Sequence, residues 1–391
     1  MKIMIVSDLA PPVWGGAENY VVNLGSRLAE LGHEVHWVTS KIPNTIELEV
    51  LDNIYIHRVP IIYPNRYFFP GRQSFSITSI IPAIKLARRM DIVQVNSLVA
   101  GFSGWVIAKY ARKSSLLFCH ELFGDLWKLV GQNFLEKYCY PLFERSMAKS
   151  PYNWFACPSE YSKKSLIKQG APKNKITIIP HGTELQFNMN SNEDFRKEFD
   201  LNENFTIGYI GRLNIKKTAQ SKNIKTLLKT VSLLSHEIPN LKLILGGKGF
   251  ENLVPIIHEL GIQEKVIYLG NVPYSETQNF YKACDVVICP ALSDGFCFLL
   301  AEASACGIPT VATNLGAHPE RVIHNKTGLL TSVEPEDLKQ NVIKLFKDES
   351  LRKELGRNAQ EYVKKFTWKE SVKKHVEIYN KLIEQKQHKQ V

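Results

Sequence analysis

The sequence lacks paired cysteines, and this absence excludes two classes of protein. Its seven cysteines are scattered at positions 119, 139, 157, 284, 289, 297 and 306. No CxxC pair and no Cys/His cluster has the spacing of metal ligands, so the sequence predicts neither a disulfide framework nor a structural zinc site. This cysteine usage favours a reducing, cytoplasmic location. We expect no metal site.

Long apolar runs are missing as well. The two longest stretches without charge, residues 92–108 and 303–319, are interrupted by polar residues, Gly or Pro and are too short for a membrane span. The N-terminal residues 1–12 have the pattern of a first strand followed by prolines, not that of a signal peptide. We therefore expect a soluble protein, with peripheral attachment to the inner face of a membrane as the remaining membrane option.

What the chain does contain is a globular composition with an excess of basic charge. Its 391 residues are 44% hydrophobic and 22% charged, which excludes wholesale disorder and suits two domains. The net charge is +11, and residues 57–112 hold eight Lys and Arg side chains against one Asp. Such clusters bind nucleic acid, anionic membranes or acidic substrates; no nucleic-acid-binding motif accompanies this one, so we expect no nucleic acid partner.

Strand and helix patterns alternate through the chain and predict an α/β fold. Apolar runs at residues 2–7 and 34–39 are separated by a helical pattern at residues 18–31, and a further apolar run lies at 92–95. The alternation restarts at 206–210 after a polar segment at 193–204. We predict two doubly wound domains over residues 1–190 and 191–370, with residues 371–391 as a C-terminal basic helix that packs back on the N-terminal domain. Such sheets bind ligands at the carboxyl ends of their strands.

Three segments contain residues suited to binding a phosphorylated ligand. Gly15-Gly16 lies between the first strand and the first helix, where backbone N–H groups favour an anion; a tight turn is the alternative interpretation. Arg212 and Lys222 follow a strand and could clamp a diphosphate, or could be solvated surface charges. Glu302 lies on an apolar helix after a glycine turn, where it needs hydroxyls, or a structural Arg or Lys, as its partner.

Taken in order, these motifs resemble the retaining GT-B glycosyltransferases of family four, also called glycosyl transferases group 1. The resemblance spans essentially the full chain. The segments that carry it are Gly15-Gly-Ala-Glu18, Leu117-Phe-Cys-His120-Glu, Pro180-His-Gly-Thr-Glu184, Gly211-Arg-Leu213 with Lys222, Leu245-Gly-Gly-Lys-Gly249, Asp294-x7-Glu302, Gly307-Ile-Pro309 and Phe366-Thr-Trp368. The resemblance implies the GT-B fold, with two facing Rossmann-like domains, an acceptor-binding N-terminal and a donor-binding C-terminal one, and an interdomain cleft.

The resemblance also implies a role for each matching residue. Glu302 would hold the ribose hydroxyls of the donor, and Asp294 would contact the transferred sugar. Arg212 and Lys222 would neutralise the leaving diphosphate, Gly16 would donate a backbone N–H, and His120 would lie near the reaction centre. The N–H groups of the helix start would face the sugar and diphosphate; they belong to Phe296, Cys297, Phe298, Leu299 and Leu300.

The sequence departs from the family pattern in three places. Asp294 stands where Glu is usual, which leaves the choice of sugar open. An extended loop between Arg212 and Lys222 makes Lys217 a rival for the phosphate role. Gln94 and Asn96 occupy positions where the family often has two histidines.

No Asp-x-Asp occurs in the chain, although metal-dependent transferases of the other common architecture use it to hold Mg²⁺ or Mn²⁺. We therefore predict a metal-independent, retaining hexosyltransferase that needs no cofactor beyond a nucleoside-diphosphate sugar. The alternatives are another GT-B enzyme, such as a sugar-nucleotide epimerase or a glycan phosphorylase, and a non-catalytic nucleotide-sugar-binding module.

The basic window also contains aromatic residues, which predicts a docking surface for a glycan or a lipid-linked acceptor at an anionic membrane. Packing of these aromatics in the core is the alternative. The residues expected to form the surface are Arg66, Phe68, Phe69, Arg72, Arg88 and Arg89.

Overall fold

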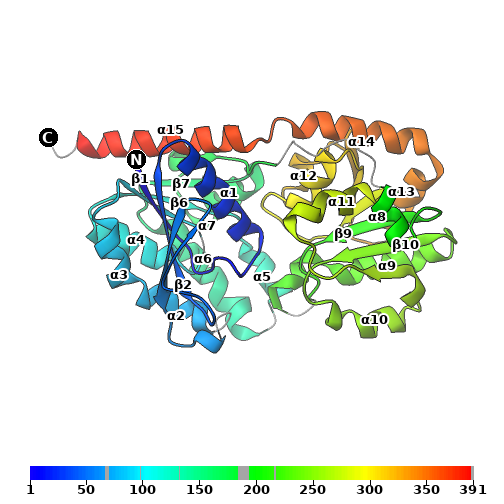
Figure 1. Ribbon diagram of the computed structural model, residues 1–391, viewed down its shortest axis with the longest axis horizontal. Coiled ribbons are helices and arrows are strands. Elements are labelled where there is room, and N and C mark those ends of the chain that lie inside the picture. The colour runs from blue at the N-terminus through cyan, green and yellow to red at the C-terminus, as the bar shows by residue number, and fades with distance from the viewer. Residues whose placement is uncertain (67–69, 97, 132, 184–192, 215–216, 389–391) are drawn as a thin grey trace. The chain divides into compact units, whose positions relative to one another are not determined.

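The computed structural model describes residues 1–391 apart from 67–69, 97, 132, 184–192, 215–216 and 389–391 (Figure 1). The chain divides into two compact units, each built on one sheet. The first unit comprises Met1–Gly124, Tyr140–Gly182 and Trp368–Val391, and the second comprises Asp125–Cys139 and Thr183–Thr367.

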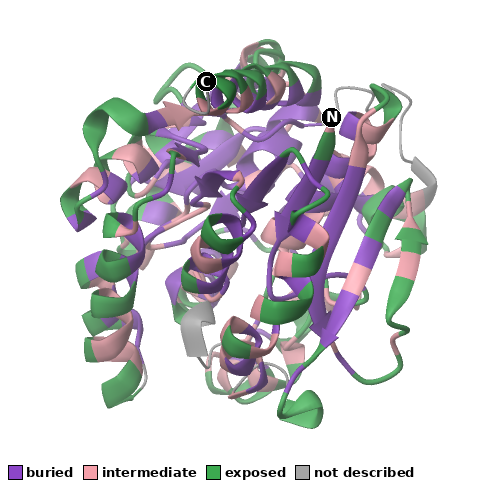
Figure 2. Cartoon of the chain, turned by 90° about the vertical axis from the view of Figure 1, so that its left-hand side faces the viewer, coloured by how far each residue is buried: buried purple, intermediate pink, exposed green. Residues whose placement is uncertain are grey.

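The first unit contains an eight-stranded sheet in the order β3-β4-β2-β1-β5-β6-β7-β8, parallel except for the β3–β4 pair. Its strands are β1 (Lys2–Val6), β2 (Glu34–Lys41), β3 (Leu48–Leu51), β4 (Ile54–Pro60), β5 (Ile92–Val95), β6 (Ser114–Phe118), β7 (Trp154–Cys157) and β8 (Ile176–Ile178). The inner strands are apolar on both faces because helices cover both, and Figure 2 shows them buried beneath helices with exposed outer faces.

The helices of the first unit connect these strands in the right order for parallel crossovers. They are α1 (Gly16–Glu30), α2 (Arg72–Thr78), α3 (Ile80–Ala87), α4 (Gly101–Tyr110), α6 (Tyr140–Lys149), α7 (Glu160–Gln169) and α15 (Trp368–Gln387).

The final helix, α15, belongs to the first unit, although its sequence follows the second. The Tyr20 hydroxyl of α1 lies 2.6 Å from His375 Nε2, and Ser114 Oγ donates to the Leu382 carbonyl over 2.8 Å. Tyr379 donates to Gln94 of β5. The helix is therefore held by buried polar contacts as well as by its apolar face.

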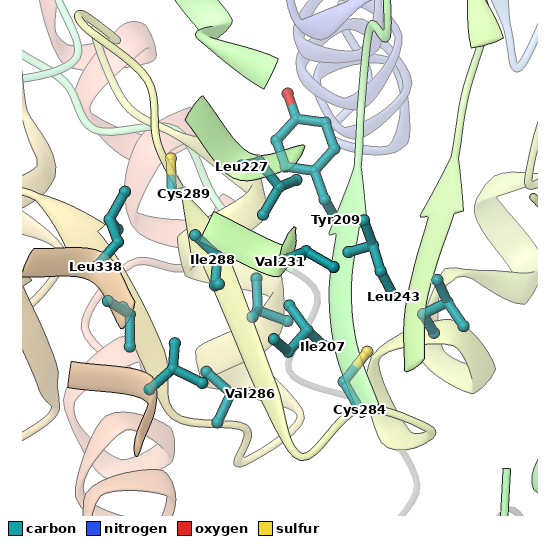
Figure 3. Close-up of a cluster of buried hydrophobic side chains, with 14 of the residues drawn as sticks. Ile207, Tyr209, Leu227, Val231, Leu243, Cys284, Val286, Ile288, Cys289 and Leu338 are labelled. Atoms are coloured by element: carbon teal, nitrogen blue, oxygen red, sulfur yellow. The ribbon is translucent and has the colours of Figure 1, made fainter. Parts of the chain in front are cut away.

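The second unit contains a six-stranded parallel sheet in the order β11-β10-β9-β12-β13-β14. Its strands are β9 (Phe205–Ile210), β10 (Leu241–Gly246), β11 (Val266–Tyr268), β12 (Val286–Cys289), β13 (Thr310–Thr313) and β14 (Gly328–Thr331). Its helices are α5 (Trp127–Val130), α8 (Glu193–Glu198), α9 (Ile224–Ser235), α10 (Val254–Glu259), α11 (Thr277–Lys282), α12 (Phe298–Ala305), α13 (Pro335–Lys347) and α14 (Glu349–Val363). Figure 3 shows side chains of β9, β10 and β12, among them Ile207, Leu243 and Ile288, packed with Leu227 and Val231 of α9.

The structural units differ from the predicted domains in one long segment and at two short edges, where Thr183 belongs to the second unit and residues 368–370 belong to the first. Residues Asp125–Cys139 were expected in the N-terminal domain but cluster with the second unit, because α5 contacts the 3₁₀ helix Lys217–Lys222. The predicted boundary at residues 190 and 191 lies outside the described residues. Across the part of the chain that the structure describes, no helix is long and apolar enough to cross a membrane.

Candidate functional site

The second sheet places the donor motifs at its topological switch point. Strands β9 and β12 are neighbours there, while their crossover connections run to opposite sides of the sheet, to β10 and to β13. Arg212 follows the carboxyl end of β9, and Asp294 follows that of β12. In doubly wound sheets the ligand binds at this point, because the diverging loops leave a crevice above it. The two motifs therefore meet where a ligand is expected.

Two glycines let the loops after β9 and β10 approach each other. Gly247 has a φ of +123°, and a Cβ there would lie 1.8 Å from the Gly211 carbonyl oxygen. The Gly211 N–H donates to the Gly246 carbonyl over 2.9 Å. This close approach fixes the backbone that carries Arg212, whose side chain is exposed. Only glycine at position 247 permits it.

Asp294 and Lys222 form an ion pair at this edge. Lys222 Nζ lies 2.5 Å from Asp294 Oδ2, although the two residues are 72 positions apart. Burial by itself would raise the pKa of Asp294, but Lys222 and the nearby backbone N–H groups hold it at about 2. The carboxyl is therefore ionised at neutral pH, and Lys222 keeps its charge beside it.

Two of the five N–H groups that were expected to face the donor at the start of α12 are bound to Asp294 instead. The N–H groups of Phe296 and Cys297 donate to Asp294 Oδ1 over 3.1 and 2.6 Å, so they are bound within the loop and do not face a donor. Phe298, Leu299 and Leu300 form the first turn of α12, where N–H groups have no partner within the helix. An anion is favoured at such a helix start, because the first-turn N–H groups lie at the positive end of the helix dipole.

Glu302 lies on α12 and is 9% exposed. Burial raises its pKa to about 7, and the Tyr281 hydroxyl donates to its Oε2 over 2.7 Å. Tyr281 of α11 thus holds one carboxylate oxygen in place. Tyr281 could not be predicted from the sequence, because an aromatic residue on a helix carries no signal beyond core packing.

Arg321 is a second residue that the sequence analysis missed. It is 4% exposed, and its guanidinium lies 4.4 Å from the ring centroid of Phe296 and 4.0 Å from that of Phe366. Among the described residues, its Nε and Nη1 have no hydrogen-bond partner. Burial lowers its pKa to about 10, so it remains a cation behind the Phe296 turn.

In the first unit, Gly16 and His120 lie at the carboxyl edge of the sheet. Gly16 is the first residue of α1 after β1, and His120 follows β6. His120 Nδ1 lies 3.3 Å from His181 Nε2, and burial together with His375 lowers the pKa of His120 to about 3. His120 is therefore a neutral imidazole at physiological pH. The neighbouring Gln94 is buried and donates to Asn96 Oδ1 over 2.7 Å.

The residues expected to form one docking surface lie apart. Arg66 and Arg72 follow β4 at the carboxyl edge, and Arg72 pairs with the buried Asp8, so it is not free for docking. Arg88 and Arg89 are exposed just before β5, at the opposite edge of the same parallel sheet. Phe68 and Phe69 lie outside the described residues. The expectation of a single surface is thus wrong, because an entire strand length separates its two halves.

Two protein-family models match the chain. One, Glycosyltransferase Family 4, matches residues 14–187, and the other, Glycosyl transferases group 1, matches residues 190–362. The chain is 24% identical over 384 residues to the N-acetyl-α-D-glucosaminyl L-malate synthase of Bacillus anthracis, covering 97% of each.

Solved structures have the same fold. The sucrose-phosphate synthase of Thermosynechococcus elongatus superposes with a TM-score of 0.83 at 21% identity, covering 97% of this chain and 98% of that one. HepE of Anabaena, in complex with UDP and glucose, superposes with a TM-score of 0.81 at 18% identity, covering 97% and 100%.

Two α/β units of this topology, with a site at the switch point of the second, define the class as GT-B. The chain belongs to the group 1 glycosyltransferases, as the resemblance predicted. It is a glycosyltransferase of glycan biosynthesis, and neither an epimerase nor a phosphorylase is favoured.

Proposed function

We propose that this glycosyltransferase transfers a hexose from a nucleoside-diphosphate sugar to an acceptor hydroxyl, with retention at the anomeric carbon and without a metal ion on the diphosphate. The observation that carries the proposal is the arrangement at the β9–β12 switch point. Lys222 and Asp294 are paired there. Glu302, which lies eight residues after Asp294 in the chain, is oriented by Tyr281. HepE, which has the same fold, binds UDP and glucose, and this supports a donor of that class.

Each group has a chemical task in this proposal. Glu302 accepts from a ribose hydroxyl, and Arg212 and Lys222 neutralise the charge that develops on the leaving diphosphate. The first-turn N–H groups of α12 add a positive helix terminus. His120, which is neutral, is able to hydrogen-bond a sugar hydroxyl but not to supply positive charge. The departing phosphate oxygen takes the acceptor proton, so no protein nucleophile is assigned.

A donor panel tests the transfer reaction. The purified chain is incubated with UDP-, GDP- and ADP-sugars, and release of the nucleoside diphosphate is followed with and without candidate acceptors. We expect one donor to give acceptor-dependent release, and the anomeric configuration of the product, read by NMR, to match that of the donor. Donor binding without release would favour a non-catalytic module, and an inverted product would contradict retention.

Metal independence is tested separately. Arg212, Lys222 and the α12 terminus supply the positive charge in this proposal. We therefore expect the rate after EDTA treatment to change less than twofold when Mg²⁺ or Mn²⁺ is added back, which is a change of about 0.4 kcal/mol at most in the activation free energy. The steady-state rate with a saturating donor is the measurement. A tenfold or greater stimulation by either ion would show that the diphosphate needs a metal.

We further propose an anionic acceptor or an anionic membrane as partner of the first unit. A surface pocket of about 560 Å³ is lined by Arg88, Lys109, Tyr110, Ala111 and Arg112. Four of these residues are exposed, three of them basic, and their charges are concentrated at the amino edge of the sheet. The Bacillus anthracis relative is named for L-malate, which is itself an anion. This pocket lies at the opposite edge of the sheet from His120, so it is the candidate for docking to an anionic surface and not for holding the acceptor hydroxyl at the reaction centre.

Liposome flotation tests the membrane part. We expect binding to acidic but not to zwitterionic vesicles, with weaker binding at high salt, because each basic residue near an anionic surface contributes about 1 kcal/mol. Arg88→Glu with Arg112→Glu should weaken binding by at least about 30-fold. The matched control is Lys225→Glu with Lys229→Glu, which changes the charge equally on the exposed face of α9. No flotation with acidic vesicles at low salt would contradict the membrane partner and leave a soluble anion.

A further inference from the structure

Three side chains with metal-ligating atoms converge in the core of the second unit. Cys289 ends β12, Cys297 precedes α12, and His318 begins the 3₁₀ helix His318–Glu320 after β13. They are 2%, 3% and 0% exposed. Their ligating atoms all lie within 4.8 Å of one another. Sequence spacing did not reveal this cluster, because the three residues come from separate segments.

The distances in the cluster suit a tetrahedral metal centre. Cys289 Sγ lies 3.5 Å from Cys297 Sγ and 3.6 Å from His318 Nε2. Metal–sulfur bonds of about 2.3 Å and metal–nitrogen bonds of about 2.0 Å at tetrahedral angles place sulfur atoms about 3.8 Å apart, and sulfur and nitrogen about 3.5 Å apart. Both distances from Cys289 Sγ thus lie within a few tenths of an ångström of those that one shared ion requires.

Neighbouring groups fix the imidazole of His318 in the orientation and tautomer that a ligand requires. Its Nδ1 lies 2.9 Å from the Thr313 carbonyl oxygen and 3.0 Å from the Thr313 hydroxyl. That hydroxyl donates to the Ala291 carbonyl over 2.5 Å, so both oxygens near Nδ1 are acceptors. The proton consequently lies on Nδ1, and the lone pair of Nε2 points toward the two sulfurs. This is the outer arrangement typical of metal-bound histidines.

From this geometry we infer that Cys289, Cys297 and His318 form a binding site for a thiophilic metal ion, with Zn²⁺ as its representative. Two thiolates and an imidazole suit Zn²⁺ or Cu⁺ and not Mg²⁺ or Ca²⁺, which prefer oxygen. Binding displaces one proton from each thiol, and the two thiolate charges compensate the divalent ion. The inference does not rest on the proposed transfer reaction.

The bound ion would connect three segments next to the donor site. Cys297 has a left-handed φ of +63°, which is strained for a residue with a Cβ, and its N–H donates to Asp294. A metal bond to its sulfur would hold this turn against β12 and the segment after β13. We therefore expect Zn²⁺ to raise the melting temperature of the full chain.

Metal binding is measured on the reduced, EDTA-treated full-length chain. Equilibrium dialysis against Zn²⁺ followed by elemental analysis should find one ion per chain, and excess Mg²⁺ should not displace it. Co²⁺ should give the intense near-ultraviolet band of a thiolate–cobalt bond, which identifies sulfur as a ligand. Absence of stoichiometric Zn²⁺, or Co²⁺ binding without the thiolate band, would overturn the inference; the latter would indicate the His120–His181 pair instead.

Variants locate the site. Cys297→Gly removes one ligand at a position whose left-handed φ suits glycine, so the variant should fold, and we expect its affinity for Zn²⁺ to fall at least tenfold with loss of the cobalt band. Cys289→Ala should behave likewise. Cys284→Ala is the matched control, because Cys284 is also a buried cysteine of this core but lies outside the cluster. Unchanged binding by Cys297→Gly, or an equal loss in Cys284→Ala, would refute the assignment.

Discussion

Replacement of Glu302 by alanine is expected to lower kcat/KM by roughly 30- to 1,000-fold while the chain stays folded. The carboxylate is buried, and its Oε2 is held by Tyr281. In the proposed function this carboxylate accepts from the donor ribose. Loss of a charge-assisted contact of this kind costs about 2–4 kcal/mol of transition-state binding. Initial rates over a range of donor concentrations are the measurement.

The control for folding uses the pH dependence of stability. The folded pKa of Glu302, about 7, lies above its ordinary value of 4.5, so between these pH values the folded chain holds the proton that the unfolded chain releases. Stability therefore falls as pH rises through this range, and burial of the carboxylate is most costly above pH 7. The stability deficit of Glu302→Ala should accordingly be smaller at pH 8 than at pH 5.

A second variant separates orientation from contact. Tyr281→Phe keeps the carboxylate and removes only its hydrogen bond, so we expect a smaller loss of kcat/KM, about tenfold at most. Near-normal kcat/KM for Glu302→Ala would refute the assignment of Glu302 to the donor. A loss for Tyr281→Phe as large as that for Glu302→Ala would show instead that the carboxylate acts only when the Tyr281 hydroxyl holds it in place.

Lys222→Ala is expected to lower kcat by about 10²- to 10³-fold. Removal of one preorganised charge-stabilising group costs about 2.7–4 kcal/mol in a site that excludes water. The same change leaves the buried Asp294 without its ion pair, so the pKa of Asp294 should rise from about 2. The acid limb of the kcat/KM profile should then move to higher pH if ionised Asp294 is needed for turnover, whereas the fall in kcat at a pH where Asp294 is ionised reports the contact of Lys222 with the diphosphate.

Lys217→Ala is the matched control for this prediction, because Lys217 begins the same 3₁₀ helix that Lys222 ends. We expect less than a threefold change in kcat, within about 0.7 kcal/mol. If Lys217→Ala reduces kcat more than Lys222→Ala does, then Lys217 contacts the diphosphate, and the pairing of Lys222 with Asp294 has a structural role only. Activity is assayed with each variant at a saturating donor concentration.

Much of the fold could be predicted from local sequence. The strands β1, β5 and β9 lie within one residue of the apolar runs that predicted them, because strands buried on both faces need continuous apolar side chains. The hairpin of β3 and β4 was not predicted. Its residues at the sheet edge alternate between buried and exposed, and such a short alternating pattern resembles a loop.

The sequence by itself determined the GT-B class and the residue types of the donor site. The close approach of two loops requires glycine at position 247, and this requirement is visible in the sequence. The order of the motifs from Gly16 to Glu302 is visible there as well. The assignments of Arg212, Lys222, Asp294 and Glu302 to the donor follow from the same motifs and remain predictions.

Only the tertiary structure decided which side chains are partners. Lys222 meets Asp294 across 72 residues, and Tyr281 meets Glu302 from a neighbouring helix. The structure likewise directed Arg72 to Asp8 and gathered the Cys289 cluster from three segments. The physical reason is that a crossover places the carboxyl ends of distant strands side by side, so the charge, burial and ligand geometry of each group depend on residues that no local pattern contains.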